Sequence, residues 1–172
     1  YSLFSNPSFS RIFEESISPE SIHSRYQCMS IKPSSDLSLD ATDKVIFKSP
    51  SLVTYTEADK EYIKADAKAE AQMFEFLQEH KVPHLAHYYG SKEYEDGRTS
   101  FAQEYVGPSL LSQYLSSSST EDLSYEDIKR ILKQSLEFFA KLEELGIFYG
   151  DLKPGNMSYN KVTGQVYFFD FG

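Results

Sequence analysis

YGDLKPGN (149–156) and FFDFG (168–172) are the two stretches that decide the fold of this chain. Each follows a short run of apolar, β-forming residues, so each is predicted to be a loop at the end of a strand. Together they supply four polar side chains, Asp151, Lys153, Asn156 and Asp170. Carboxylate and amide oxygens are the ligands that a hard cation such as Mg²⁺ takes, and a lysine beside them suits a phosphate. The alternative is a polar loop with a coincidental D-x-K-x-x-N pattern.

Taken in order and with this spacing, the two stretches resemble the catalytic loop and the D-F-G motif of eukaryotic-type protein kinases. The resemblance implies that Asp151 is the catalytic base, that Lys153 contacts the γ-phosphate, and that Asn156 and Asp170 bind the metal. It also implies ATP and Mg²⁺ as cofactors. By the same resemblance, the D-L-K-P sequence is typical of Ser/Thr rather than Tyr specificity.

The resemblance continues upstream, at VIFK (45–48), which matches the V-A-I-K strand of the family. It implies that Lys48 holds the α- and β-phosphates and that a helix glutamate pairs with this lysine. Glu70 fits, because it is followed three and four places on by Met73 and Phe74. The alternatives are a solvated lysine at a strand end and an ordinary surface glutamate.

A third matching segment is QEYV (103–106), which resembles the hinge of the family. The resemblance implies that backbone groups of Glu104 and Val106 bind adenine and that Gln103 is the gatekeeper; a plain sheet strand is the alternative. VGPSLLSQYL (106–115) and the tail from Tyr149 are most similar to the casein kinase 1 and vaccinia-related kinase group. The resemblance covers roughly residues 11–172.

Local patterns predict the elements around these segments. Thr56 with Asp59 has the form of a capping box, which predicts a helix over 57–79. Its apolar stripe is expected to consist of Ile63, Met73, Phe74 and Leu77, and Ala67 and Ala71 are expected to let a neighbouring element approach closely. Short strands are expected at 11–17, 24–31 and 44–48. Asp96-Gly97 lies between two β-rich runs and predicts a hairpin, because both central turn residues of a tight hairpin need positive φ.

The second half of the chain is expected to be mainly helical. A short helix is predicted over 109–115. Ser124 and Asp127 form a second capping box, and Gly146 is a natural helix stop. Between them we expect one broad apolar face, made of Ile128, Ile131, Leu132, Ser135, Phe138, Phe139, Leu142 and Leu145. Short strands follow at IFY (147–149), MSY (157–159) and QVYFF (165–169).

This order of elements predicts an α+β fold. With the resemblance, it implies a kinase-like bilobal architecture, in which a small antiparallel N-lobe sheet with one helix precedes the first part of a helical C-lobe. The expected organisation is an N-terminal extension over 1–10, an N-lobe over 11–106 and the beginning of a C-lobe over 107–172. The resemblance implies that the family's fold continues beyond Gly172, so we expect a truncated domain.

The sequence departs from the family pattern where the resemblance expects a glycine-rich loop. Ser18, Glu20 and His23 occupy the expected glycine positions, and the first glycine of the chain is Gly90. Glycines let the backbone approach phosphates closely, and a glutamate would both obstruct and repel them. We therefore expect weakened ATP binding. Tyr149-Gly150 also replaces the usual His-Arg, which removes the arginine that pairs with a phosphorylated activation loop.

Composition narrows the classes of partner. The 172 residues include 26 acidic and 17 basic side chains, a formal charge of −9, which argues against general nucleic-acid binding. One cysteine, Cys28, cannot form an internal disulfide and fits a reducing compartment. No apolar run approaches the roughly 18 residues of a membrane span. The expected location is therefore cytoplasmic or nuclear, and the expected partner is a protein substrate or a scaffold partner.

Three functions follow from these observations. The first is a Ser/Thr protein kinase that transfers phosphate from ATP to protein hydroxyls, active in its full-length form but inactive as this isolated segment. The second is a pseudokinase that serves as a scaffold or binding module, favoured by the absent glycines. The third is a small-molecule phosphotransferase of the aminoglycoside type, which also carries Gly-Asp before its asparagine. The hinge and F-D-F-G favour a protein kinase over this third function.

Overall fold

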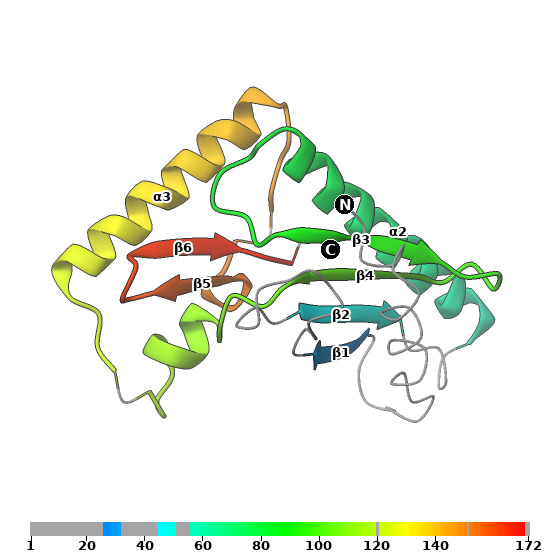
Figure 1. The fold of residues 1–172 in the computed structure, drawn as a ribbon, viewed down its shortest axis with the longest axis horizontal. Coiled ribbons are helices and arrows are strands. Elements are labelled where there is room, and N and C mark those ends of the chain that lie inside the picture. The colour runs from blue at the N-terminus through cyan, green and yellow to red at the C-terminus, as the bar shows by residue number, and fades with distance from the viewer. Residues whose placement is uncertain (1–25, 32–44, 51–55, 120, 151, 171–172) are drawn as a thin grey trace. The chain divides into compact units, whose positions relative to one another are not determined.

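The computed structural model describes residues 26–31, 45–50, 56–119, 121–150 and 152–170 (Figure 1). They form two compact units, each described here by itself. The first contains the described residues up to Phe76 and the stretch His87–Tyr105, and the second contains Leu77–Ala86 and the described residues from Val106 onward. The predicted strand at 11–17 and the three replaced glycine positions, Ser18, Glu20 and His23, lie outside the described residues.

The first unit is built on a four-stranded antiparallel sheet with the order β1-β2-β4-β3 (Figure 1). Its strands are β1 (Tyr26–Ile31), β2 (Val45–Pro50), β3 (Tyr88–Glu93) and β4 (Thr99–Glu104). β2 is therefore flanked on both sides, with Lys48 in register with Cys28 of β1 and Phe101 of β4. The predicted α+β class with a small antiparallel sheet is confirmed.

The hairpin between β3 and β4 forms as predicted, but its turn is of a different kind. Tyr94 N–H donates to Arg98 O at 2.8 Å, and Gly97 N–H donates to Tyr94 O at 2.9 Å. Gly97 has a φ of +84°, whereas Asp96 is absent from the positive-φ residues of the described chain. The prediction that both residues take positive φ is wrong. The longer loop needs only the glycine in that region, and the Asp96 carboxylate instead accepts a hydrogen bond from Arg98 N–H at 3.1 Å.

The helix α2 (Glu57–Glu79) has the predicted bounds. Its cap forms as expected, with Asp59 N–H donating to Thr56 Oγ1 at 3.2 Å. The buried stripe of the helix contains Ile63, Ala67, Glu70, Ala71, Phe74 and Leu77, while Met73 is only half-buried. In the first unit, Phe74 contacts the ring of Tyr88 from β3 at 5.5 Å and that of Phe101 from β4 at 6.4 Å between centroids. The helix therefore packs on one face of the sheet through this stripe.

The second unit contains the long helix α3 (Tyr125–Glu144) and the short π-helical turn η3 (Leu111–Leu115). The predicted capping box is present at Ser124 and Asp127. The helix ends at Glu144 and is followed by Leu145 and Gly146. Gly146 has a φ of +72°, and its N–H donates to Glu143 O at 3.0 Å. The short helix predicted over 109–115 is present as η3 and begins two residues later.

The predicted broad apolar face of α3 is only partly correct. Ile131, Phe138 and Leu142 are buried, but Ile128 is 43% and Leu132 is 60% exposed. The buried stripe is narrower than the apolar pattern and includes two polar residues, Asp127 and Gln134. Both have hydrogen-bond partners on β5 or β6, which explains how a polar side chain can replace an apolar one there.

A two-stranded antiparallel sheet, β5 (Met157–Asn160) and β6 (Gln165–Phe168), lies beside α3 in the second unit (Figure 1). Phe168 stacks on Phe138 of α3 with ring centroids 4.0 Å apart and planes within 7°. The predicted strand at 147–149 is wrong: these residues form no strand. Ile147 N–H donates to Leu142 O at 2.9 Å and so completes the helix end instead.

None of the helices in the described part of the chain is long and apolar enough to cross a membrane.

Asp127 connects the start of α3 to β5. Its Oδ1 accepts a hydrogen bond from the Tyr159 hydroxyl at 2.6 Å, and its Oδ2 accepts from Ser124 N–H at 3.0 Å and from Ser124 Oγ at 2.8 Å. These bonds, the one from Tyr159 foremost, lower the pKa of Asp127 to about 2. The ionised carboxylate is therefore the form that the fold requires.

We predict that Asp127→Asn flattens the acid limb of the stability curve. A carboxyl group titrates near 3.9 in the unfolded chain, so the stability that Asp127 contributes is complete above about pH 4. It is lost as the pH falls through about 2, the pKa in the folded chain. Between pH 5 and pH 2.5 the melting temperature of the wild type should fall more steeply than that of the variant.

Asp122→Asn is the matched control, because no hydrogen bond or ion pair among the described residues uses the Asp122 carboxylate. Its melting curve should follow that of the wild type at every pH. Parallel acid limbs for the wild type and Asp127→Asn would contradict the assignment.

Candidate functional site

A buried ion pair between Lys48 and Glu70 is the central feature of the first unit. Lys48 Nζ lies 2.9 Å from Glu70 Oε1, and the two side chains are only 12% and 1% exposed. The Lys48 ammonium also lies 5.7 Å from the centre of the Phe101 ring. Lys48 is therefore not a solvated strand-end lysine, and Glu70 is not a surface charge.

The sequence places both groups by simple periodicities. Lys48 is in register with Phe101, and Phe101 contacts Phe74 of α2, so Lys48 is on the sheet face that the helix covers. Glu70 is four residues before Phe74 and three after Ala67, which puts its carboxylate on the buried stripe of the helix. The β2–β4 register and the helix period together bring the two charges into contact.

The end of β4 contains a buried polar side chain. Gln103 is 3% exposed, and its Oε1 has no hydrogen-bond partner among the described residues. It is in register with Ile46, two residues from Lys48, so it lies on the same sheet face as the ion pair. An unpaired buried acceptor is costly in a folded protein and is commonly explained by a ligand or a water molecule.

Some backbone and side-chain groups of Glu104 and Val106 already form hydrogen bonds. Glu104 N–H donates to His87 O at 2.7 Å, and its Oε2 accepts from His87 N–H at 2.9 Å. In the second unit, the Val106 carbonyl accepts a hydrogen bond from Ser158 Oγ at 2.9 Å. No hydrogen bond within the described ranges uses Val106 N–H, so this donor is available to a ligand.

The second unit holds Asn156 and Lys153 on one short segment. The 3₁₀ turn η4 (Pro154–Asn156) begins after Lys153, and Asn156 N–H donates to Lys153 O at 2.9 Å. Asn156 is 4% exposed, whereas Lys153 is exposed. Pro154 at the first position of the turn has the φ that the turn needs, which explains why the loop takes this form here.

Asp170 is brought beside Asn156 by the β5–β6 pairing. Met157 is in register with Phe168, and Phe169 N–H donates to Asn156 O at 3.1 Å, so the segment entering Asp170 is bonded to the segment leaving η4. Asp170 has a φ of +80°, a left-handed conformation that few residues other than glycine adopt. Such conformations cost energy and are concentrated at functional sites.

Sequence reasoning missed one residue of this arrangement. The Tyr149 hydroxyl donates to Asp170 O at 3.1 Å, and the Tyr149 ring packs edge-on against Phe138 at 5.9 Å. From the sequence, Tyr149 was notable only as a departure from the family pattern. The only sequence feature that could have pointed to Tyr149 is its position two residues before Asp151.

The predicted site residues thus fall into two groups. The first unit holds Lys48, Glu70, Gln103 and Glu104, and the second holds Val106, Lys153, Asn156 and Asp170. Asp151, the expected catalytic base, lies outside the described residues. The roles assigned to these residues stay predictions.

In the described ranges, no three His, Cys, Asp or Glu side chains gather as a metal site would require. Asn156 and Asp170 offer one amide and one carboxylate oxygen donor. This pair alone is too small for an all-protein metal site, but it fits Mg²⁺, which commonly takes few protein ligands and completes its shell with water and phosphate oxygens.

The chain is similar over a short segment to two curated proteins from Encephalitozoon cuniculi (strain GB-M1), named probable cell division control protein 7 homolog 1 and homolog 2. Each is 46% identical over 46 residues, which covers 27% of this chain and 13% of each relative. No protein-family model matches the chain. The similarity is therefore local to one segment.

We predict that Glu70→Ala destabilises the first unit by about 3 kcal/mol, because it removes the carboxylate that lies 2.9 Å from the buried Lys48 ammonium. Glu75→Ala, at an exposed position of the same helix, should change the free energy of unfolding by less than about 0.5 kcal/mol. Urea denaturation of the three proteins measures the difference.

The double variant Lys48→Met/Glu70→Leu separates the charge effect from the loss of packing. Removing both charges while keeping the volume should restore stability to within about 1 kcal/mol of the wild type. Equal losses in Glu70→Ala and Glu75→Ala would show that the pair is not buried as described.

Proposed function

We propose that this chain is part of a Ser/Thr protein kinase domain, which transfers phosphate from ATP to protein hydroxyls with Mg²⁺. The observation that carries the proposal is the buried Lys48–Glu70 ion pair, 2.9 Å long, on a strand and a helix. A buried ion pair is a weak source of stability, so its presence favours a role in holding a lysine for an anionic ligand. A triphosphate is such a ligand.

The residues fit the proposed cofactors. Lys48 would contact the α- and β-phosphates, Lys153 the γ-phosphate, and Asn156 and Asp170 would hold Mg²⁺, which when bound neutralises charge on the phosphates. Val106 N–H is an available donor and Gln103 Oε1 a buried acceptor for a base. Asp151 would orient the substrate hydroxyl and accept its proton.

Further support comes from the arrangement around Asp170. Its left-handed backbone, the Tyr149 bond to its carbonyl and the neighbouring Phe169–Asn156 bond hold this carboxylate at the end of a paired strand. The local similarity to two cell division control protein 7 homologs is compatible with the proposal. The matched segment is 13% of each relative, so the activity of the whole protein, its protein substrate and its cytoplasmic or nuclear location are proposals too.

A pseudokinase scaffold is the second candidate. The observation that favours it is the sequence at the expected phosphate loop, where Ser18, Glu20 and His23 replace glycines. Side chains there would obstruct the phosphates, and Glu20 would repel them. The two candidates differ in one measurable property, magnesium-dependent binding of ATP. A small-molecule phosphotransferase would share that property and differ in its phosphate acceptor.

We predict that ATP with Mg²⁺ raises the melting temperature of this chain and that Asp170→Ala abolishes the magnesium-dependent part. A ligand that binds only the folded chain stabilises it by RT ln(1 + [L]/Kd), about 2.7 kcal/mol at a hundredfold excess over Kd. Lys48→Met should weaken the effect of ATP both with and without Mg²⁺. Lys92→Met, on another strand of the same sheet, is the matched control and should behave as the wild type.

The second step uses the full-length protein, in which Asp151→Asn should abolish phosphate transfer to a protein while leaving the ATP-induced stabilisation intact. If ATP gives no stabilisation in a chain that still unfolds cooperatively, the scaffold function replaces the kinase function. Transfer to an aminoglycoside but to no protein would instead favour the small-molecule phosphotransferase.

A further inference from the structure

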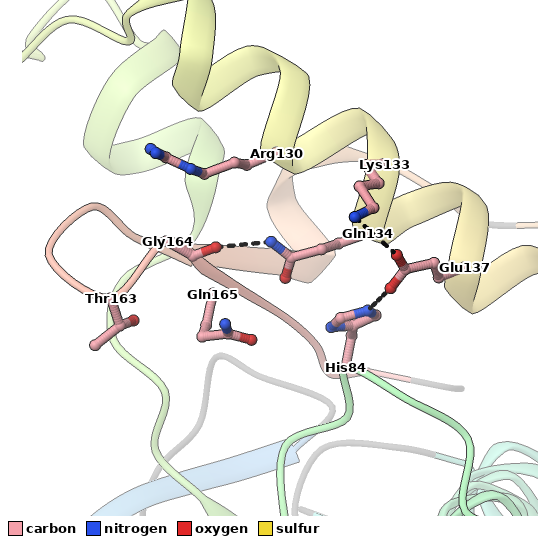
Figure 2. Close-up of a pocket in the computed structure, with 8 residues that line it drawn as sticks. All are labelled: His84, Arg130, Lys133, Gln134, Glu137, Thr163, Gly164 and Gln165. Carbon is pink, nitrogen blue, oxygen red and sulfur yellow. Dashed lines mark hydrogen bonds and ion pairs between the residues drawn. The ribbon is translucent and has the colours of Figure 1, made fainter.

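A polar pocket of about 350 Å³ lies in the second unit, lined by residues of three segments. Arg130, Lys133, Gln134 and Glu137 project from α3, while Thr163, Gly164 and Gln165 lie at the β5–β6 turn and His84 on the loop before β3 (Figure 2). None of the residues proposed to bind ATP or Mg²⁺ lines it. The pocket therefore needs an explanation of its own.

Gln134 of α3 joins the helix to the β5–β6 turn at this pocket. Its Nε2 donates to Gly164 O at 2.7 Å (Figure 2). Its Oε1 accepts from Val166 N–H at 2.8 Å. The side-chain amide thus bonds the β5–β6 turn to α3 on both sides of Gln165. Because both its oxygen and its nitrogen are used in this way, the amide holds the turn at a fixed position over the helix.

Gly164 allows the turn to lie close to α3. Its φ is +71°, and a Cβ atom at this position would lie 3.2 Å from Arg130 Cδ. Any other residue would therefore meet both backbone strain and a close contact with the Arg130 side chain. The close approach brings the Thr163 and Gln165 side chains to the same pocket as the cations of the helix.

The charges of the pocket are mainly positive. Arg130 and Lys133 are the basic lining residues besides His84, and Glu137 is the single carboxylate of the lining. Arg130 also lies 3.6 Å from Asp127 Oδ1, which does not line the pocket, so Lys133 is the cation with more capacity for a ligand. The Glu137 carboxylate has two neighbours in the pocket (Figure 2). His84 Nε2 lies 2.8 Å from Glu137 Oε2, and Lys133 Nζ lies 3.9 Å from Glu137 Oε1. Lys133 is 78% exposed, so this long ion pair leaves most of its donor capacity for another partner.

Neutral donors complete the lining. No hydrogen bond among the described residues uses the Thr163 hydroxyl or the Gln165 side-chain amide. Lysine and arginine cations with neighbouring hydroxyl and amide donors form the set that proteins use to bind phosphate oxygens.

We propose that this pocket binds a phosphoryl group, either as free phosphate or on a phosphorylated serine or threonine side chain. Lys133 is the principal cation, Thr163 and Gln165 donate hydrogen bonds, and Arg130 adds positive potential at the side of the β5–β6 turn. Glu137 opposes the charge of the ligand and limits its affinity. The proposal does not depend on the proposed kinase function, because it involves none of the same residues.

The test is a titration of the isotope-labelled chain with inorganic phosphate at constant ionic strength, followed by the backbone amide signals of Thr163, Gly164 and Gln165. These signals should shift and saturate. Lys133→Gln should weaken binding about threefold to fivefold, and Glu137→Gln should strengthen it by a similar factor, the size expected for a solvent-exposed charge. Lys129→Gln, which removes a cation from the same helix outside the pocket, should leave the affinity within about twofold of the wild type.

A second arm replaces phosphate by N-acetyl-O-phosphoserine amide, with the unphosphorylated amide as its control. Tighter binding of the phosphorylated amide than of phosphate identifies a phosphorylated side chain as the ligand, and equal binding identifies free phosphate. Lys48→Met should leave the signals of the turn unchanged, which separates this pocket from the proposed nucleotide site. The absence of saturable shifts at the turn, or equal weakening by Lys133→Gln and Lys129→Gln, would overturn the proposal.

Discussion

The burial of one carboxylate, that of Glu70, constrains the whole first unit. A carboxylate that is 2% exposed must have a counter-charge, and Lys48 is that partner. The pair forms only if β2 keeps its register with β4 and if α2 turns its Ala67–Phe74 stripe toward the sheet. A one-residue slip of β2 would move Lys48 to the opposite face and break its ion pair with Glu70. The β2–β4 register, the rotation of α2 about its axis and the Lys48–Glu70 ion pair therefore depend on one another.

In the second unit, several contacts meet at the end of β6. Phe168 N–H donates to His84 O at 2.7 Å, Ala86 N–H donates to Phe168 O at 3.1 Å, and the Phe168 ring stacks on Phe138. The next residue, Phe169, is bonded to Asn156 O. Backbone, ring and neighbouring loop therefore fix this strand end together, and the polypeptide reaches Asp170 from a rigid position.

Much of this structure was predictable from sequence because its signals are local. Capping residues, a glycine stop and apolar periods of two or 3.6 residues correctly indicated α2, α3, the β3–β4 hairpin and β5–β6. The wrong predictions have non-local causes. Ile128 and Leu132 extend the apolar pattern of α3, yet Asp127 and Gln134 take buried positions, because Tyr159 and the β5–β6 turn offer them partners from 30 or more residues away. For the same reason the His84–Glu137 pair, 53 residues apart, left no sequence signal.

Three polar residues lie on the buried stripes of the two long helices: Asp127, Gln134 and Glu70. Their partners differ, and the partners indicate whether the stability of the fold explains each residue. Asp127 bonds Ser124 at the start of its helix, accepts a bond from the Tyr159 hydroxyl and lies 3.6 Å from the half-exposed guanidinium of Arg130. Gln134 bonds backbone groups of the adjacent turn. Both satisfy groups that the fold itself leaves unpaired, so stability explains them. Glu70 instead meets an ammonium group that could have stayed in water. Apolar side chains of the same volume would serve the packing at least as well, since two charges must be desolvated to form the pair. Packing and stability therefore account for Asp127 and Gln134, but they do not explain why Lys48 and Glu70 are charged.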